Sequence, residues 1–298
     1  MKILVTGSEG NIGQVLVPYL RSQGHSVRGI DVVQNFKDGY LTVDINNGAD
    51  LINSFYSFLP DVVFHLAAMV SRVTCESSPC TAVKTNLYGT ENIIQLCRQV
   101  NAKLIFFSTS EVYGNSGGVL SEDRTDLQPN NFYGLSMLIG EQLVKYDVEN
   151  GLDAIIVRPF MFYHEDETIG DHRSAMIRFV TSLLKKERIT VHTDSLRSWM
   201  HLDDAVVVLE NLCYIGSFQL LNIGSNCVYS MERIARIICE QLDLKYEDYV
   251  TESPLPEKMT LQKIPSLEKQ YELTEYLCKI RIEEGITRII AKLKDKRW

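Results

Sequence analysis

Three glycines near the N-terminus form a loop of a kind that can bind phosphate groups. The loop follows an apolar run at residues 2–6 and opens a segment of helical spacing. Gly7 permits a tight turn, Gly10 lets backbone N–H groups approach a pyrophosphate, and Gly13 allows close packing of helix on strand. This position between strand and helix favours a dinucleotide site over a simple glycine-rich turn.

Asp31 ends the next predicted strand, where its carboxylate can accept hydrogen bonds from an adenosine ribose. A 2′-phosphate there would meet a like charge, and the neighbouring Val32 and Val33 supply no cation. We therefore expect NAD rather than NADP as the cofactor. Asp44 and Ile45 follow the third strand and are expected at the adenine edge, although a helix-capping role explains Asp44 nearly as well.

A parallel sheet would position these residues. Short apolar runs alternate with helix-length segments at residues 2–6, 26–30, 40–43, 62–66, 104–108 and 154–158. This alternation predicts an α/β fold built on a Rossmann-type, doubly wound parallel sheet. We expect residues 1–159 to form the NAD-binding domain, with some later segments returning to it.

The pattern changes after Pro159. Residues 160–170 are expected to form a loop, and apolar spacing predicts helices over 174–186 and 230–242. We expect residues 160–298 to form mainly a smaller C-terminal lobe that binds the substrate.

Composition limits the class of protein. The 298 residues include 45% apolar and 23% charged side chains, and a net charge of -8 disfavours a nucleic-acid partner. Seven cysteines without a Cys-x-x-Cys pair favour a reducing compartment, and no apolar run approaches the length of a spanning helix. We expect a cytoplasmic protein with no membrane partner.

Further motifs extend along the chain, at 65–68 (HLAA), 86–92 (NLYGTEN), 108–114 (STSEVYG), 133–134 (YG), 158–159 (RP), 197–204 (RSWMHLDD) and 222–225 (NIGS). With the glycine loop, they make the chain resemble the extended short-chain dehydrogenase/reductases, specifically the NAD-dependent nucleotide-sugar epimerase, dehydratase and decarboxylase family. The resemblance implies a tightly bound NAD that is recycled, a UDP-sugar substrate and a homodimer. In dimers of that family, the helix matching residues 90–100 and the helix starting near Tyr133 pack with their partners as a four-helix bundle.

The resemblance also implies roles for single residues. The implied cofactor contacts are Gly7, Gly10, Asn11, Ile12, Gly13, Asp31, Asp44, Ile45, Leu66, Ala67, Ala68, Asn86 and Tyr133. The implied substrate contacts are Ser71, Arg72, Thr109 and Arg197. Arg197 matches the arginine that pairs with the nucleotide diphosphate, and a surface ion pair is its alternative.

Thr109, Ser110, Glu111 and Tyr133 match the reacting positions of the family. The resemblance implies that Thr109 contacts the sugar O4 and that Tyr133 takes the O4 proton. Sugar dehydratases have Asp-Glu where this chain has Ser110 and Glu111, and a serine is too weakly acidic to expel water efficiently. UDP-glucuronate decarboxylases share the Thr-Ser-Glu string.

Met137 is the main departure, because the family has a lysine four residues after the tyrosine. That lysine holds the nicotinamide ribose and lowers the pKa of the tyrosine, so Tyr133 is expected to be a poorer base here. Met161 replaces an asparagine that contacts the substrate in many relatives. Lys258 or Lys263 is a candidate substitute for the arginine-rich turn that the family places near the C-terminus.

We expect a reaction that does not need an acid at position 110. A UDP-N-acetylhexosamine 5,6-ene would be oxidised at C4, hydride would return to C6, and Glu111 or a nearby donor would protonate C5, giving a 4-keto-6-deoxy sugar. This pattern resembles enzymes of pseudaminic acid synthesis. The alternatives are a UDP-sugar 4-epimerase, a UDP-glucuronate decarboxylase, for which no arginine dedicated to a substrate carboxylate is evident, and a non-enzymatic sensor of NAD and UDP-sugar.

The run 164–167 (HEDE), together with Asp171 and His172, has the residue types of metal ligands. Their spacing matches no regular zinc-ligand pattern, so we expect a solvated loop in the substrate lobe and no metal.

Overall fold

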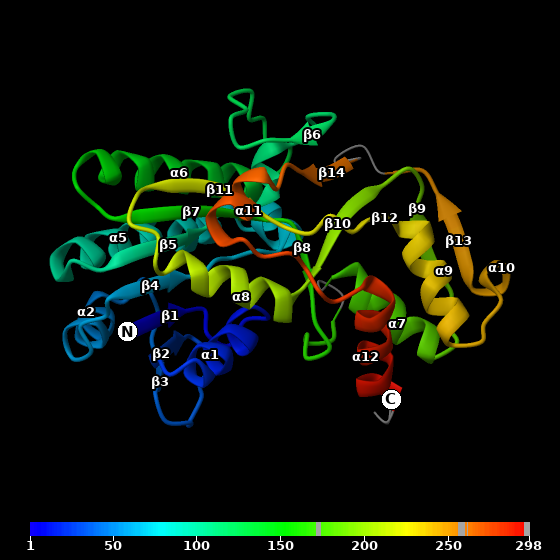
Figure 1. Cartoon of the computed structure of the whole chain (residues 1–298), viewed down its shortest axis with the longest axis horizontal. Helices are drawn as coiled ribbons and strands as arrows, with labels where there is room; N and C mark the ends of the chain where they lie inside the picture. The colour runs from blue at the N-terminus through cyan, green and yellow to red at the C-terminus, as the bar shows by residue number, and fades with distance from the viewer. Residues whose placement is uncertain (171–173, 256–259, 261, 295–298) are drawn as a thin grey trace.

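A seven-stranded sheet forms the larger part of the molecule, in a computed structural model that describes residues 1–170, 174–255, 260 and 262–294 (Figure 1). Its order is β11-β7-β5-β4-β1-β2-β3, and all neighbouring strands are parallel. The strands are β1 (Lys2–Thr6), β2 (Ser26–Asp31), β3 (Tyr40–Thr42), β4 (Val62–His65), β5 (Lys103–Phe107), β7 (Ala154–Pro159) and β11 (Gln219–Ile223). The predicted Rossmann-type α/β fold is confirmed.

Helices cover both faces of this sheet, because successive side chains of each strand point to opposite sides. Leu4 packs in a core with α2 (Gly48–Tyr56), α5 (Gly89–Val100) and α6 (Phe132–Glu149). Ile3 and Val5 pack on the other side with α1 (Gly13–Ser22) and α8 (Leu202–Leu212). The connection from β4 to α5 contains α3 (Arg72–Ser77), α4 (Pro79–Val83) and a π-helical turn at Lys84–Tyr88.

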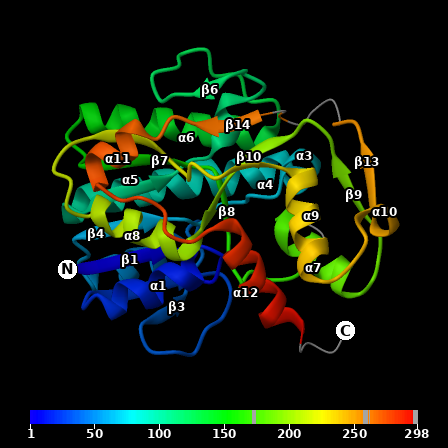
Figure 2. The same ribbon diagram turned by 45° about the vertical axis from the view of Figure 1, so that its right-hand side comes forward.

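A second lobe has its own core and two small sheets (Figure 2). One sheet has the order β12-β10-β14-β6, with β8 also paired to β10: β6 (Val119–Leu120), β8 (Met161–Tyr163), β10 (Leu196–His201), β12 (Val228–Ser230) and β14 (Gln262–Pro265). The other pairs β9 (Ile189–His192) with β13 (Val250–Ser253). The helices are α7 (Ala175–Leu184), α9 (Met231–Gln241), α10 (Tyr246–Tyr249) and α12 (Ile282–Lys294), while α11 (Glu268–Thr274) lies beside α8 and β11.

The two predicted helices of this lobe are confirmed as α7 and α9, but the loop predicted at 160–170 is partly wrong. Residues Met161–Tyr163 form β8, which pairs in parallel with Trp199–His201 of β10. The alternation of apolar and polar residues within a short segment cannot reveal a three-residue strand whose partner is almost forty residues away. The predicted candidates Asp171, His172 and Lys258 lie outside the described residues.

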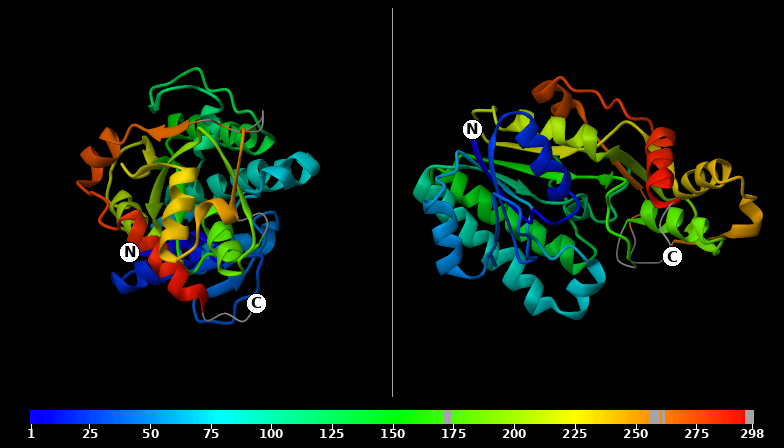
Figure 3. Two further views of the ribbon diagram at one scale, coloured as in Figure 1. Left: turned by 90° about the vertical axis from the view of Figure 1, so that its right-hand side faces the viewer. Right: turned by 90° about the horizontal axis from the view of Figure 1, so that it is seen from below.

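Segments cross between the two lobes in both directions. Strand β6, from the first half of the chain, belongs to the smaller sheet, whereas β11 and α8, from the second half, complete the larger one. His201 ends β10 and begins α8, so this strand leads directly from one lobe into the other (Figure 3). No helix of the described residues has the length and apolar character needed to cross a membrane.

Candidate active site

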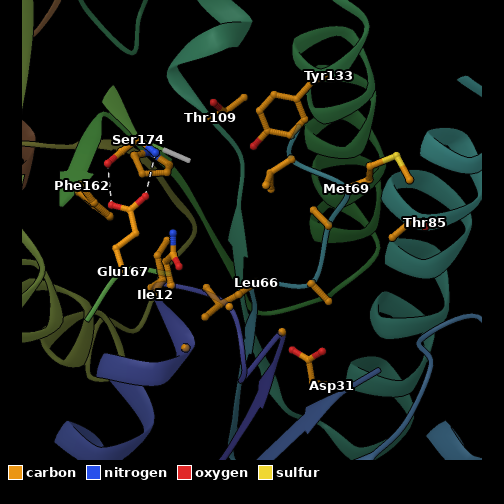
Figure 4. A pocket seen from close by; sticks show the side chains of 18 of the residues that line it. Ile12, Asp31, Leu66, Met69, Thr85, Thr109, Tyr133, Phe162, Glu167 and Ser174 are labelled. Carbon is orange, nitrogen blue, oxygen red and sulfur yellow. Dashed lines mark hydrogen bonds between the residues drawn. The ribbon is translucent and has the colours of Figure 1, made fainter. Parts of the chain in front are cut away.

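A cavity of about 720 Å³ lies where the carboxyl ends of the parallel strands meet the second lobe (Figure 4). This edge is where open α/β sheets bind their ligands. The predicted site residues in its wall are Gly7, Gly10, Asn11, Ile12, Gly13, Asp31, Asp44, Ile45, Leu66, Ala67, Ala68, Arg72, Thr109, Ser110, Glu111 and Tyr133. The sequence did not indicate Thr85, Phe162 or Ser174, which also line it, and Glu167 was considered only as a metal ligand.

The glycine loop has no room for side chains. Gly7 has a positive φ of +68°, and a Cβ there would lie 2.8 Å from the backbone nitrogen of Ala67. A Cβ on Gly13 would lie 2.5 Å from the carbonyl oxygen of Gly7. The loop therefore presents bare backbone to the cavity beside the N-terminus of α1, a cradle that fits the pyrophosphate of a dinucleotide.

Asp31 is fixed at the far end of this cradle. Its two carboxylate oxygens accept hydrogen bonds from the backbone N–H groups of Glu9 and Val33, each at 2.9 Å. The side chain faces the cavity (Figure 4). An anion held here suits the ribose hydroxyls of NAD and repels a 2′-phosphate.

Thr109 and Tyr133 come together from two elements. Thr109 follows β5, and its hydroxyl accepts the N–H of Glu111 at 3.2 Å, while Tyr133 lies in the first turn of α6. Their side chains lie side by side in the cavity (Figure 4). Burial raises the pKa of Tyr133 above its ordinary value, and the hydroxyl of Thr109 opposes this shift.

Three nitrogen donors surround Glu111. Lys263 forms a short ion pair with Oε1, Asn131 donates to Oε2 at 2.9 Å, and Arg72 lies 4.0 Å from Oε1. Burial alone would raise the pKa of Glu111, but Lys263 and Arg72 outweigh it and lower the pKa to about 2. These contacts favour the carboxylate form of Glu111, and the expectation that Glu111 or a nearby donor protonates C5 stays a prediction.

Four predicted site residues lie outside the described wall of this cavity. Met137 lies on α6, is buried in the core and is not among the described residues that line the cavity. Asn86 accepts the N–H of Met69 at 2.7 Å and donates to the hydroxyl of Ser136 at 2.9 Å. Ser71 caps α3 by accepting a hydrogen bond from the backbone N–H of residue 74 at 3.2 Å.

Arg197, the fourth, is buried, so the alternative of a surface ion pair is wrong. Its guanidinium donates to the carbonyl oxygens of Leu196 and Thr260, at 2.8 and 2.5 Å. Burial lowers its pKa to about 10, and Glu111 partly opposes this shift. Its contact with a diphosphate stays a prediction.

Beneath the site, a buried ion pair joins α6 to the sheet. Arg158 donates through two nitrogens to the carboxylate of Glu141, at 2.8 and 2.7 Å, and Ser108 donates to the same carboxylate at 2.5 Å. A bidentate pair of this kind sets orientation as well as distance. It holds the helix of Tyr133 against the strands β5 and β7.

His164 and His201 form a buried cluster with two carboxylates, so the solvated loop predicted for His164 is wrong. The Nδ1 atoms accept backbone N–H groups of Asp166 and Asp203, at 3.0 and 3.2 Å. Each Nε2 faces a carboxylate, Asp203 at 3.3 Å and Glu165 at 2.9 Å. A neutral ring whose Nδ1 accepts must carry its proton on Nε2, so these nitrogens donate to the carboxylates and are not free to ligate a metal.

The sequence profile of the NAD dependent epimerase/dehydratase family matches residues 3–224. The chain belongs to this family. It is therefore an NAD-dependent enzyme of the epimerase, dehydratase and decarboxylase type, and the cofactor expected from the glycine loop and Asp31 is confirmed.

Named relatives within this family modify sugars. The chain is 30% identical over 258 residues to the UDP-N-acetyl-α-D-glucosaminuronate decarboxylase of Bacillus cytotoxicus, covering 80% of this chain and 79% of that protein. Its fold matches the UDP-glucose 4-epimerase of Thermotoga maritima with a TM-score of 0.91, and MoeE5 in complex with UDP-glucuronic acid and NAD with a TM-score of 0.89. Both solved structures are 22% identical to this chain, and in each comparison the match covers 98% of both chains.

Proposed function

We propose that this enzyme decarboxylates a UDP-uronate: it oxidises C4, releases the C6 carboxylate as CO2 and reduces C4 again. The observation that carries the proposal is the position of Lys263 and Arg72 in the same cavity as Thr109 and Tyr133. The first two are cations able to hold a carboxylate, and the last two are hydroxyl groups suited to the sugar O4. The relative that acts on UDP-N-acetyl-α-D-glucosaminuronate supports the same substrate class.

The charges around Glu111 suit an anionic substrate. Lys263 and Arg72 bring two positive charges to one carboxylate, and Arg197 adds a third nearby, so the surroundings of Glu111 are net positive. A uronate carboxylate supplies the missing negative charge, whereas a neutral hexose leaves the excess uncompensated. Although no arginine dedicated to a substrate carboxylate is evident in the sequence, Arg72 and Lys263 together could bind one.

Tyr133 would remove the O4 proton, with Thr109 orienting the hydroxyl by a hydrogen bond. Gly7, Gly10, Gly13 and Asp31 would hold NAD, which would supply reversible hydride transfer at C4. A 4-keto uronate is a β-keto acid, so the electrons of the C5–C6 bond pass into the C4 carbonyl as CO2 leaves. No hydroxide is expelled in this step, which removes the need for an aspartic acid at the position of Ser110.

Two other reactions remain candidates. A 4-epimerase would also use Thr109 and Tyr133 but would leave the carboxylate in place. The 5,6-ene reaction is consistent with Ser110, which lines the cavity, but it uses no carboxylate and so leaves the cation pair unexplained. The relatives give no support to a role in pseudaminic acid synthesis.

The test is incubation of the purified protein with UDP-glucuronate or UDP-N-acetylglucosaminuronate carrying an isotope label at C6. Labelled CO2 and a UDP-pentose are expected from wild type, with loss of both in Tyr133→Phe. Tyr146→Phe is the matched control, because Tyr146 is an exposed tyrosine on the same helix. A C4 epimer without CO2 would assign the epimerase. Turnover of a UDP-N-acetylhexosamine 5,6-ene in a separate incubation, with both UDP-uronates left unchanged, would assign the third reaction.

A further inference from the structure

Two buried histidines that the sugar chemistry does not use lie where the two lobes meet. His164 follows β8, and His201 ends β10 at the start of α8, with their ring centroids 5.0 Å apart. We propose that this pair is a proton-sensitive latch, which holds the loop at residues 164–170 against the cofactor site while both rings are neutral and releases it in acid. The latch would act on NAD whichever of the sugar reactions the enzyme performs.

Each ring pairs with a carboxylate that is close in sequence to the other ring. Nε2 of His164 faces Asp203 at 3.3 Å, and Nε2 of His201 faces Glu165 at 2.9 Å. Residues 164 and 165 follow β8 of the smaller lobe, whereas Asp203 lies in the first turn of α8, which packs on the large sheet. The two crossed bonds therefore join the loop at 164–170 to the larger lobe.

The backbone opposes a second proton on either ring. The N–H of Asp166 donates to Nδ1 of His164 at 3.0 Å, and the N–H of Asp203 donates to Nδ1 of His201 at 3.2 Å. A charged imidazole carries N–H groups at both nitrogens, so its Nδ1 would face a donor with another donor. Protonation must therefore break the turn after His164 and the N-cap that His201 provides to α8.

Titratable groups surround the two rings on every side. Within the described part of the chain they are Tyr163 of β8, Glu165 and Asp166 of the loop, Asp203 and Asp204 of α8, and Glu284, Arg288 and Lys292 of α12. Burial lowers the pKa of His201, and the nearby carboxylates of Asp203 and Glu165 only partly oppose this shift. His201 is therefore neutral at pH 7 and takes up a proton only in acid.

The loop at 164–170 leads from the latch to the glycine loop. The N–H of Glu167 donates to the carbonyl oxygen of His164 at 3.3 Å, and both residues line the cavity. The hydroxyl of Thr168 then donates to the side-chain oxygen of Asn11 at 3.4 Å. Opening the latch would release the segment of the smaller lobe that contacts the cradle for the NAD pyrophosphate.

The experiment measures the dissociation rate of NAD from the full-length enzyme, by exchange against an excess of isotope-labelled NAD between pH 7.5 and pH 5.5. An imidazole freed from the latch has an ordinary pKa of about 6.5. Opening should therefore be favoured by about 10-fold for each ring at pH 5.5 relative to pH 7.5. Dissociation of NAD from wild type should speed up about 10-fold or more over this range.

The double variant His164→Asn, His201→Asn removes the titration and keeps the turns. An asparagine oxygen can accept the same backbone N–H but takes up no proton in this range. The double variant should therefore lose NAD at nearly the same rate at pH 7.5 and pH 5.5. His192→Asn is the matched control, because His192 lies on β9 and is not among the described residues that line the cavity, and it should keep the wild-type response.

Nitrogen NMR of the histidine rings in wild type gives a measurement that does not depend on the stability of a variant. The rings of His164 and His201, assigned with the two single variants, should carry a proton on Nε2 alone at pH 7.5 and become charged over the range in which NAD is lost. Charged rings at pH 7.5 would overturn the latch. So would a wild-type rate that does not change with pH, or a full wild-type response in the double variant.

Discussion

The side-chain amide of Asn131 joins the start of helix α6 to the carboxylate of Glu111. Its oxygen accepts the N–H of Gly134 at 2.8 Å, and its nitrogen donates to Oε2 of Glu111 at 2.9 Å. One side chain thus caps the helix that bears Tyr133 and orients the carboxylate that holds Lys263. A single substitution here should affect stability and catalysis together.

Asn131→Ala should lower the free energy of unfolding by about 1 kcal/mol or more from the lost cap alone. Turnover should fall as well, because Glu111 loses a donor and Tyr133 loses its fixed helix start. Ser230→Ala is the matched control, since Ser230 caps α9 in the other lobe. Denaturant unfolding and a turnover assay measure both effects, and equal turnover in the two variants would contradict the prediction.

Because of Glu111, we expect the free energy of unfolding to fall at acid pH. Its pKa is about 2 in the folded protein against an ordinary value of 4.5, so the folded state takes up this proton less readily than the unfolded chain. The stabilisation is complete above pH 4.5 and is lost as the pH falls toward 2. The stability difference between wild type and Glu111→Gln should therefore shrink over this range.

Denaturant titrations at several pH values test this expectation. Glu149→Gln is the control for removal of one negative charge, because Glu149 is exposed at the end of α6. A difference that stays constant down to the acid limit would show that Glu111 is not held as a buried anion.

Met137→Lys should restore part of what the family lysine provides. A positive charge near Tyr133 lowers the pKa of the phenol, so the rise of activity with pH should move to lower pH. The same change buries a charge in an apolar core, and the melting temperature should fall. Met137→Leu keeps the burial without the charge and should leave the pH profile unchanged; an unchanged profile in the lysine variant would count against the electrostatic argument.

Gly13→Ala should weaken NAD binding and lower stability by about 1–3 kcal/mol, because the added methyl meets the backbone of Gly7. Gly48 opens α2, and a Cβ there meets nothing within 4 Å. Gly48→Ala is therefore the control and should leave both quantities near wild type. Calorimetric titration with NAD and thermal unfolding measure the contrast.

The glycine loop and Asp31 could be predicted because their requirements are local. A bare backbone before a helix and an acid at the end of a strand are visible within about thirty residues of sequence. The strands of the large sheet could be predicted for the same reason, because buried parallel strands appear as continuous apolar runs.

Lys263 and Asn131 show what could not be predicted. The position of Lys263 depends on β14 pairing with β10 and β6, and each pairing joins distant parts of the chain. Asn131 follows a common capping pattern, but the contact of its amide nitrogen with Glu111 depends on the packing of α6 against the turn after β5. His164 was misjudged for a similar reason, since β8 and β10 bring it against His201.

The ion pair between Glu111 and Lys263 spans 152 positions of the chain. During synthesis, a chain that has emerged as far as β11 already contains every strand of the large sheet, but Lys263 has not yet appeared. Until then Glu111 lacks its closest counter-charge, so an incomplete chain carries a carboxylate whose burial is opposed. Docking of β14 therefore both joins β10 to β6 and brings Glu111 its closest counter-charge.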